Sequence, residues 1–288
     1  MLILFGVFAV GIVTFHLLEQ VAPIRTEYKS GVTRRGYLAD ITSTIINGPV
    51  LSALTKIGAV YLVTRIPMQT KIMGEWSWAA QFALFFIVND FARYWLHRLY
   101  HANDFLWRIH RVHHTIVQMD AMSVFRIHIL EAVIKNCVIF LPFQLLGVDE
   151  TVIIVYSSWD ILKGFWHHAN LRTHIGKFNL FFNSAELHWW HHSTEARGQQ
   201  SNYGSILSIW DRLFHTFYWP KGEWPGAIGV DGLTDFPDDY LGQFSSIRYD
   251  DEHAREAFTA KSSDTTTNPA SDTPQQTPPI GQDIAEPA

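Results

Sequence analysis

Residues 97–114 read HRLYHANDFLWRIHRVHH and hold five of the 15 histidines of this 288-residue chain. The first two, His97 and His101, are spaced H-x-x-x-H, and the last three are spaced H-x-x-H-H. Positions i, i+3 and i+4 of an α-helix lie on one face. The spacing therefore predicts helices that each present several imidazoles on one stripe, within an all-α fold.

Further along the chain, the H-x-x-H-H spacing returns in the segment HWWHH. In the segment HHAN, His167 and His168 are adjacent, so only one of them can face a shared site, and His168 is preferred because Asn170 completes H-x-N. The candidate metal ligands are His97, His101, His110, His113, His114, His168, His188, His191 and His192. Nine imidazoles exceed the need of one ion, which takes about four to six ligands. They predict a two-metal site, and imidazole suits Fe, Zn, Cu and Ni.

Long apolar segments surround these histidines. Three of them, Met1–Leu18, Tyr37–Val63 and Trp76–Leu96, are close to the roughly 20 residues that a membrane-spanning helix needs. Ile129–Val148 and Thr151–Trp166 form a further apolar pair, predicted as a membrane hairpin at about residues 129–166 or as a pair lying in the membrane interface. The expected fold class is an all-α integral membrane multi-helix bundle with a cytoplasmic helical cap that carries the two-metal site.

The predicted organisation has three parts. Residues 1–75 contain N-terminal transmembrane helices, residues 76–258 form the histidine-box catalytic domain, and residues 259–288 form a disordered tail rich in Pro, Thr, Ser, Gln and Asp. Lys and Arg are more frequent in the loop after the first span and after the third span than between the second and the third. By the positive-inside rule, this bias predicts that the metal site faces the cytoplasm.

Composition agrees with a membrane protein. Hydrophobic residues make up 48% of the chain and charged residues 17%, against about 25% charged in a soluble domain. The net charge of −5 gives no basic patch for nucleic acid. The single cysteine, Cys137, excludes an internal disulfide and a cysteine-rich metal site.

Metal-bound imidazoles need a partner for their second ring nitrogen. Asp90 shares a helical stripe with His97 and His101 and is a candidate for that role, and an ion pair with Arg93 is the alternative. Further candidates for a supporting role are His128, Asn170, Glu186 and Asp211. Asn170 is a candidate for orienting a metal-bound water.

The remaining histidines are interpreted differently. His16 lies in the first span and is expected to make a polar contact between helices. His215 and His253 are expected at the surface or in a supporting role, and His174 is left open. For His128, the roles of ligand, supporting residue and membrane-interface residue all stay open.

The ordered set HRLYH, HRVHH, HHAN and HWWHH, followed by NYG and WDRLF, resembles the fatty acid hydroxylase superfamily, also called the sterol desaturase family, over roughly residues 80–220. The resemblance implies a membrane-bound non-haem di-iron oxygenase. It implies that the nine histidines bind two iron ions, and that O₂ is used to hydroxylate or desaturate a lipid of the sterol or fatty acyl class. Two positions depart from the family pattern: His215 replaces the Gly of WDxLFGT, and Ile129 replaces the Pro of R-x-H-P.

The expected partners follow from this reading. The chain has no dinucleotide, flavin or haem motif, so a separate electron donor is expected, of the ferredoxin, cytochrome b5 or reductase type, together with the lipid substrate, O₂ and membrane lipids, and no nucleic acid. The alternatives are a zinc-dependent membrane hydrolase, a metal transporter and a metal-binding membrane protein without oxygenase activity. The hydrolase is disfavoured because the chain has no H-E-x-x-H motif.

Overall fold

Helices dominate the part of the chain that the computed structural model describes, residues 2–28, 34–47, 58, 61, 72–231, 233 and 236–248. The α-helices are α1 (Leu2–Val21), α3 (Trp78–Ala102), α4 (Asp104–His114), α5 (Ile129–Lys135), α6 (Leu141–Leu145), α7 (Glu150–His168), α8 (Ala185–His191), α9 (Ala196–Gln199), α10 (Ile209–Leu213) and α11 (Tyr240–Phe244). Residues 37–47 are also helical. These residues contain isolated β-bridges and no strand, so the predicted all-α class is confirmed for them.

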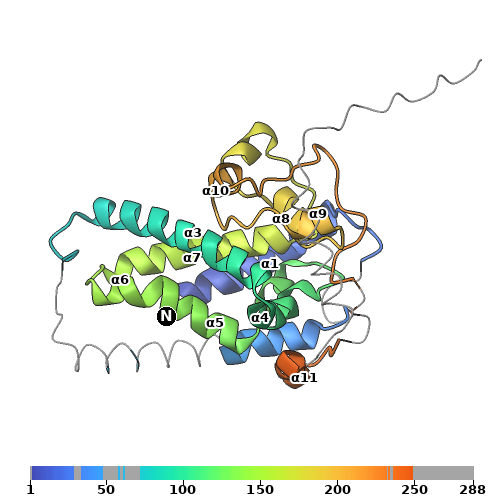
Figure 1. Ribbon diagram of the computed structural model, residues 1–288, viewed down its shortest axis with the longest axis horizontal. Helices are drawn as coiled ribbons and strands as arrows, with labels where there is room; N and C mark the ends of the chain where they lie inside the picture. Colours follow the sequence, from blue (N-terminus) through green and yellow to red (C-terminus); the bar gives the residue numbers. More distant parts are fainter. Residues whose placement is uncertain are drawn as a thin grey trace, which may run out of the picture. The chain divides into compact units, whose positions relative to one another are not determined.

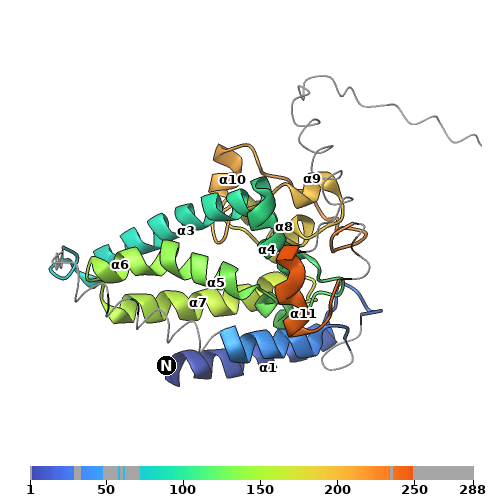
Figure 2. The ribbon, with the colours of Figure 1, turned by 60° about the horizontal axis from the view of Figure 1, so that its bottom comes forward.

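The longer helices α1, α3 and α7 run side by side, and the short helices α4, α8 and α9 gather at one end of them (Figures 1 and 2). α1 packs against α7 where Gly11 meets Phe165. A Cβ atom at Gly11 would lie 2.8 Å from Phe165 Cε2, so the missing side chain allows this close approach. Phe8 and Phe15 flank the contact, with ring centroids 5.7 and 6.0 Å from that of Phe165.

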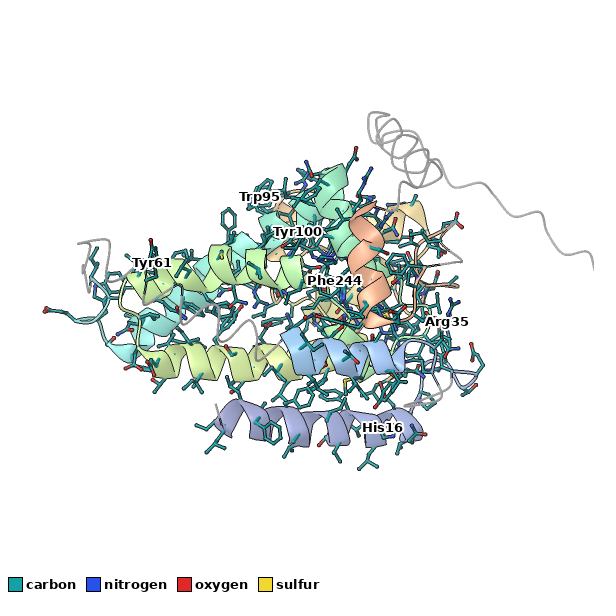
Figure 3. The ribbon with its side chains drawn as sticks, turned by 90° about the horizontal axis from the view of Figure 1, so that it is seen from below. His16, Arg35, Tyr61, Trp95, Tyr100 and Phe244 are labelled. Atoms are coloured by element: carbon teal, nitrogen blue, oxygen red, sulfur yellow. The ribbon has the colours of Figure 1, made fainter. Side chains whose placement is uncertain are left out.

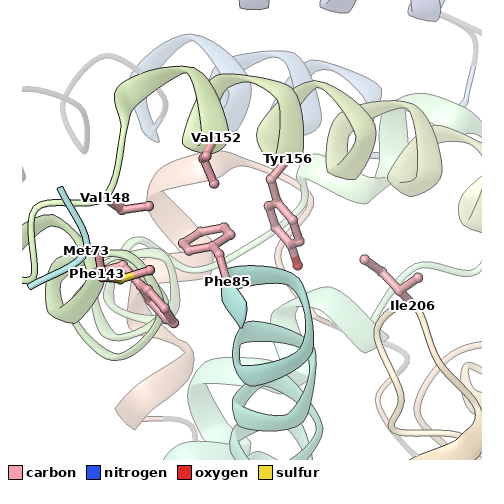
Figure 4. Packing of buried hydrophobic residues seen from close by; sticks show 7 residues of the cluster. All are labelled: Met73, Phe85, Phe143, Val148, Val152, Tyr156 and Ile206. Carbon is pink, nitrogen blue, oxygen red and sulfur yellow. The ribbon is translucent and has the colours of Figure 1, made fainter. Parts of the chain in front are cut away.

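A cluster of aromatic and aliphatic side chains joins α3 to α6 and α7 (Figure 4). The Phe85 ring lies 4.7 Å from that of Phe143 and 5.0 Å from that of Tyr156, both in edge-on arrangements. Tyr156 also donates a hydrogen bond of 3.1 Å to Asn89 Oδ1. The cluster comprises Met73, Phe85, Phe143, Val148, Val152, Tyr156 and Ile206. It fixes α7 against α3, and both helices carry candidate histidines at their last turns.

The predicted hairpin at about 129–166 is a pair of helical arms whose first arm is interrupted. α5 passes into a π-helix at Asn136–Phe140 before α6 begins. Pro142 lies in the first turn of α6 and has no N–H to donate to the carbonyl four residues earlier, so a regular α-helix cannot continue through it. The second arm, α7, starts at Glu150 with Asp149 as its N-cap and extends two residues beyond the predicted end, to His168.

Of the described helices, α1 is the one long and apolar enough to cross a membrane, with a mean hydropathy of 2.2 in its most apolar window. Most of the predicted second span, 37–63, lies outside the described residues. α3 exposes large apolar side chains, among them Ile87, Phe91 and Trp95 (Figure 3). The multi-helix membrane bundle stays a prediction. The expectation for His16 is wrong, because its side chain is exposed instead of lying between helices.

Candidate metal centre

The nine candidate histidines lie together in two groups. The five-histidine group contains His97, His101, His110, His114 and His191, and the four-histidine group contains His113, His168, His188 and His192. In each group every histidine offers one ring nitrogen, and these nitrogens lie within 4.8 Å of one another. The spacing within groups suits two separate ions, each surrounded by imidazole nitrogen.

Each H-x-x-H-H motif is divided between the two groups. In α4, His110 and His114 belong to the five-histidine group and His113 to the four-histidine group. At α8 the division is reversed, since His191 joins the five-histidine group while the other two histidines of HWWHH join the four-histidine group. Positions i+3 and i+4 lie about 100° apart around a helix of 3.6 residues per turn. The three histidines of each motif therefore do not form a single stripe but face two different groups. α4 gives two histidines to the five-histidine group and one to the four-histidine group, and the motif at α8 gives the reverse.

Hydrogen bonds to the Nδ1 atoms orient the five-histidine group. His97 Nδ1 lies 2.9 Å from the Tyr203 carbonyl oxygen, and His191 Nδ1 lies 2.7 Å from the Ser201 carbonyl oxygen. His110 Nδ1 lies 3.1 Å from Glu131 Oε2, which is within ion-pair distance but lacks hydrogen-bond geometry. A carbonyl oxygen accepts only, so Nδ1 of His97 and of His191 carries the proton and Nε2 keeps its lone pair. The negative charge of Glu131 favours the same tautomer of His110.

The four-histidine group is oriented in the same way. His113 Nδ1 donates to the Arg126 carbonyl oxygen at 3.1 Å. His168 Nδ1 lies 3.2 Å from Ser123 Oγ, whose own proton is donated to the Asp120 carbonyl oxygen at 2.6 Å. Ser123 therefore accepts the hydrogen bond from His168, and the Nε2 atoms of both histidines are left with lone pairs.

A network of charges holds the segment that supplies these acceptors. Arg34 donates to Asp120 at 2.6 Å and to Asp40, and Arg126 donates to Asp40 at 2.7 Å. Gly36 has φ of +75°, and a Cβ atom there would collide with the Arg126 guanidinium. All four charged side chains are buried, so the network ties residues 34–40 to the segment that orients His113 and His168.

The arrangement of lone pairs favours a bound cation. His97 Nε2 lies 3.1 Å from His110 Nε2, and both atoms are unprotonated by the assignment above, so no hydrogen bond can join them. Both ring nitrogens of His114 and of His192 are buried without a hydrogen-bond partner among the described residues. Facing lone pairs and unsatisfied buried nitrogens are unfavourable unless a bound cation accepts them. The donor set therefore fits two imidazole-bound metal ions.

Burial keeps seven of these imidazoles neutral, which is the form that binds metal. Burial, together with smaller contributions from neighbouring histidines, lowers the pKa of His113 and of His191 to about 3. Burial, followed by neighbouring imidazoles, also lowers the pKa of His97, His114, His168, His188 and His192 well below 6.5.

Asp90 does not contact the histidines as predicted. Its carboxylate accepts hydrogen bonds from the backbone N–H groups of Ile206 at 2.7 Å and Leu207 at 3.0 Å, and from Trp210 Nε1 at 2.9 Å. The alternative ion pair is also absent, because Arg93 pairs with Asp160. Asp90 instead fastens the loop before α10 to α3.

Asn170 and Asp211 act on loops near the site. Asn170 Oδ1 accepts from the backbone N–H groups of Ile24 and Arg25, and its Nδ2 donates to the Arg25 carbonyl oxygen, so the side chain binds the segment after α1 instead of a metal-bound water. The Asp211 carboxylate accepts from the backbone N–H groups of Tyr203 and Gly204 at 2.7 and 2.8 Å. Asp211 thus holds the loop whose Tyr203 carbonyl orients His97.

The other candidates lie outside the two groups. His128 is the N-cap of α5, where its Nδ1 accepts from the Leu130 N–H at 3.1 Å. His167 Nε2 lies 2.9 Å from the Asn183 carbonyl oxygen. His174 lies 3.4 Å from Glu186, which accepts hydrogen bonds from Asn179 and Trp219. His253 lies outside the described residues.

His215, which stands where the family pattern has Gly, adopts a backbone conformation typical of Gly. His215 has φ of +60°, in the left-handed region that favours Gly. The next residue, Thr216, donates from its backbone N–H to the Asp211 carbonyl oxygen at 2.8 Å. The turn therefore keeps the backbone conformation for which the family pattern has a Gly.

Sequence reasoning did not place Glu131 beside His110, and it missed the backbone acceptors at Arg126, Ser201 and Tyr203. Glu131 lies in the apolar stretch RIHILE, where a buried charge is a sign of a functional partner. Every residue has a backbone carbonyl, so the side-chain type does not show which carbonyl accepts a hydrogen bond. Tyr203 does belong to the NYG motif.

Comparison with known proteins agrees with the extent of the histidine motifs. The fatty acid hydroxylase family profile matches residues 82–216. The ornithine lipid hydroxylase OlsE of Rhizobium tropici is 32% identical over 158 residues, which cover 55% of this chain and 48% of that protein. The alkylglycerol monooxygenase of Homo sapiens is 25% identical over 182 residues, which cover 63% of this chain and 39% of that protein.

A plant protein is similar over a longer stretch. The very-long-chain aldehyde decarbonylase GL1-10 of Oryza sativa subsp. japonica is 29% identical over 234 residues, which cover 75% of this chain and 74% of that protein. This chain spans less than half the length of the bacterial and human relatives above. No solved structure matches the chain.

Proposed function

Because this chain belongs to the fatty acid hydroxylase superfamily, we propose that it is a membrane-bound non-haem di-iron oxygenase that oxidises a lipid. The observation that carries the proposal is the convergence of imidazole nitrogens with lone pairs in two groups. The five-histidine group would hold one iron and the four-histidine group the other. Iron bound there would supply the activation of O₂ and the oxidation of a C–H bond, which side chains alone cannot perform.

The protein's own residues hold, orient and shield the site. The carbonyls of Tyr203, Ser201 and Arg126 and the Glu131 carboxylate fix the rings with Nε2 inward. Burial keeps the rings neutral, so they do not have to lose protons when metal binds. Val124, Phe125, Ile127 and Ile161 are among the residues that line the adjacent cavity and give it apolar wall surface.

The lipid substrate is proposed from the relatives, one named for ornithine lipid and one for alkylglycerol. The proposed substrate is a lipid of the sterol or fatty acyl class, and the proposed reaction is its hydroxylation or desaturation. Electrons would come from a separate ferredoxin, cytochrome b5 or reductase. The exposed apolar surfaces of α1 and α3 support a membrane location. A multi-pass topology with the metal site toward the cytoplasm is proposed from the distribution of Lys and Arg in the sequence.

The rice relative favours a second candidate. Its name specifies a very-long-chain aldehyde decarbonylase, and it matches three quarters of both chains. The same histidine groups would then act on a long-chain aldehyde and release a hydrocarbon one carbon shorter, with the carbonyl carbon leaving as a separate one-carbon product. Supplying an aldehyde and an alkyl lipid to the same preparation, and measuring both products, separates the two reactions.

Metal content and oxygen-dependent turnover test the proposal directly. Purified protein reconstituted anaerobically with iron should hold about two irons per chain. His191→Ala should lower the iron content and abolish O₂-dependent lipid oxidation, because His191 offers a buried Nε2 to the five-histidine group. His16→Ala is the control, because His16 is exposed on α1. One iron or none in the parent protein, or equal turnover in both variants, would refute the di-iron oxygenase.

A further inference from the structure

A cavity of about 230 Å³ borders both histidine groups. His97 and His110 of the five-histidine group line it, and so do three histidines of the other group. Its wall also contains three cationic and two carboxylate side chains, Arg93, Lys135, Lys163, Glu131 and Asp160. A charged wall is unexpected in a pocket for a purely apolar chain.

Most of these charges already have partners. Arg93 donates to both Asp160 oxygens, at 2.7 and 2.8 Å. Lys163 Nζ donates to the Ser205 carbonyl oxygen and to Ser205 Oγ, both at 2.8 Å. Glu131 faces His110, as described above. Among these five side chains, the wall therefore carries one more cation than carboxylates.

Lys135 is the cation of the wall to which the described residues give no direct hydrogen bond or ion pair. It is the last residue of α5, one turn after Glu131, and it lines the cavity. Among the residues that the structure describes, none accepts a hydrogen bond from its ammonium or lies within ion-pair distance of it. Glu131 and Asp160 attract its charge from farther away, and both already face other partners, His110 and Arg93. A partly buried ammonium without a hydrogen-bond acceptor is unfavourable, and an anion in the cavity would remove that penalty.

We propose that Lys135 binds an anionic group of the substrate, a carboxylate or a phosphate, inside the cavity beside the two histidine groups. This inference rests on the proposed function and names the substrate class as an anionic lipid. The cavity volume lies under the roughly 300–1,000 Å³ of pockets that enclose a whole drug-sized ligand. The cavity therefore holds the charged end of the lipid and the carbons next to it, and the rest of the chain extends outside.

Binding to detergent-solubilised, iron-reconstituted protein tests this assignment. The probes are dodecanoate, dodecyl phosphate, the neutral dodecanol, acetate and inorganic phosphate, and tryptophan fluorescence reports binding without turnover. Lys135→Met removes the ammonium and keeps most of the side-chain volume. Lys177→Met is the matched control, because Lys177 is exposed and does not line the cavity.

The parent protein and Lys177→Met should bind dodecanoate or dodecyl phosphate more tightly than dodecanol. Lys135→Met should weaken binding of the anionic probes about 10-fold to 100-fold, as expected for a hydrogen bond to a charged group, and leave dodecanol unaffected. Lys135→Arg should restore much of the preference. Unchanged iron content in Lys135→Met shows that the fold is intact, and unchanged anion affinity in that variant overturns the inference.

The remaining outcomes separate this inference from the proposed function. Equal affinity for dodecanoate and dodecanol in the parent protein overturns the anion site, even if iron binding and oxygen-dependent turnover persist. Anion-selective binding without iron or turnover refutes the proposed function and keeps the anion site. Binding of acetate or inorganic phosphate as tight as that of the dodecyl anions assigns the site to a free anion and overturns the lipid assignment.

Discussion

Glu131 and His110 form the contact on which the five-histidine group depends at the level of single residues. A carboxylate that accepts the Nδ1 proton fixes the ring and makes its Nε2 more basic toward a metal ion. Both side chains are buried, so solvent does not replace the carboxylate. Glu131 would thus act on a bound metal ion through His110, whose Nδ1 lies 3.1 Å from the carboxylate.

Glu131→Gln keeps the shape of this contact and removes its charge. We expect a loss of about 10-fold to 100-fold in the affinity of one of the two metal ions, with the other ion unaffected. Anaerobic metal titration measures both affinities. Glu150→Gln, at an exposed position in the first turn of α7, is the control. Equal weakening of both ions would contradict the assignment of Glu131 to the five-histidine group.

The nine histidines were identified from spacing, whereas their partners were not. Histidines spaced i, i+3 and i+4 can be recognised in the sequence, and His168 was chosen from its H-x-N context. The structure brings all nine of these histidines together. Asp90 shares the helical stripe of His97 and His101, yet nearby backbone N–H groups and Trp210 occupy its carboxylate. Helical periodicity predicts the face on which a side chain lies. It does not predict which loop packs on that face, and the loop at Ile206 and Leu207 binds Asp90.

At the scale of helices, the contact between α1 and α7 depends on one missing side chain. Gly11 allows the α1 backbone to approach Phe165 and Leu162, and a Cβ atom there would lie 2.8 and 3.0 Å from their side chains. Gly6, on the same helix, has no atom within 4 Å of the corresponding position. The two glycines make a matched pair for testing the contact.

Gly11→Ala should lower the free energy of unfolding by about 1–3 kcal/mol, because the added methyl group overpacks the contact with a buried Phe ring. Gly6→Ala should leave it unchanged or raise it by up to about 1 kcal/mol through helix propensity. Thermal unfolding of both variants in the same detergent measures the difference. A loss of equal size in both variants would mean that α1 does not pack on α7 in the way described.

Helix boundaries were predictable where the chain carries clear end signals. α7 begins after Asp149, whose side chain accepts from the Thr151 N–H at 2.7 Å. The interruption in the first arm was not predicted, because residues 129–148 read as one apolar stretch until the effect of Pro142 on the backbone is considered. The membrane arrangement of these arms stays a prediction.

At the scale of the whole molecule, the buried neutral imidazoles make the metal-free protein sensitive to acid. The pKa of His113 and of His191 falls to about 3 in the folded state, against 6.5 for an ordinary histidine. Below pH 6.5 the unfolded chain therefore binds protons that the folded chain does not. Their contribution to stability is fully present above pH 6.5 and is lost as the pH falls toward 3.

We expect the free energy of unfolding of metal-free protein to decrease between pH 7.5 and 5.5, by up to about 1.4 kcal/mol per pH unit for each such histidine below pH 6.5. Denaturant unfolding at fixed ionic strength measures this slope. Protein with both metals bound serves as the comparison and should be more stable at every pH, since only the folded state has the complete site. A flat profile for the metal-free protein would contradict the burial of neutral imidazoles.

The division of the histidines between the two groups also orders their assembly during synthesis. Four members of the five-histidine group have been synthesised once His114 is added, and only His191 is still missing. The four-histidine group then has His113 alone, and its His188 and His192 are added only with α8, about 75 residues later on a chain made at roughly 5–20 residues per second. Most of one histidine group is thus made several seconds before most of the other, so a nascent chain that meets iron early would take up the first ion before the second.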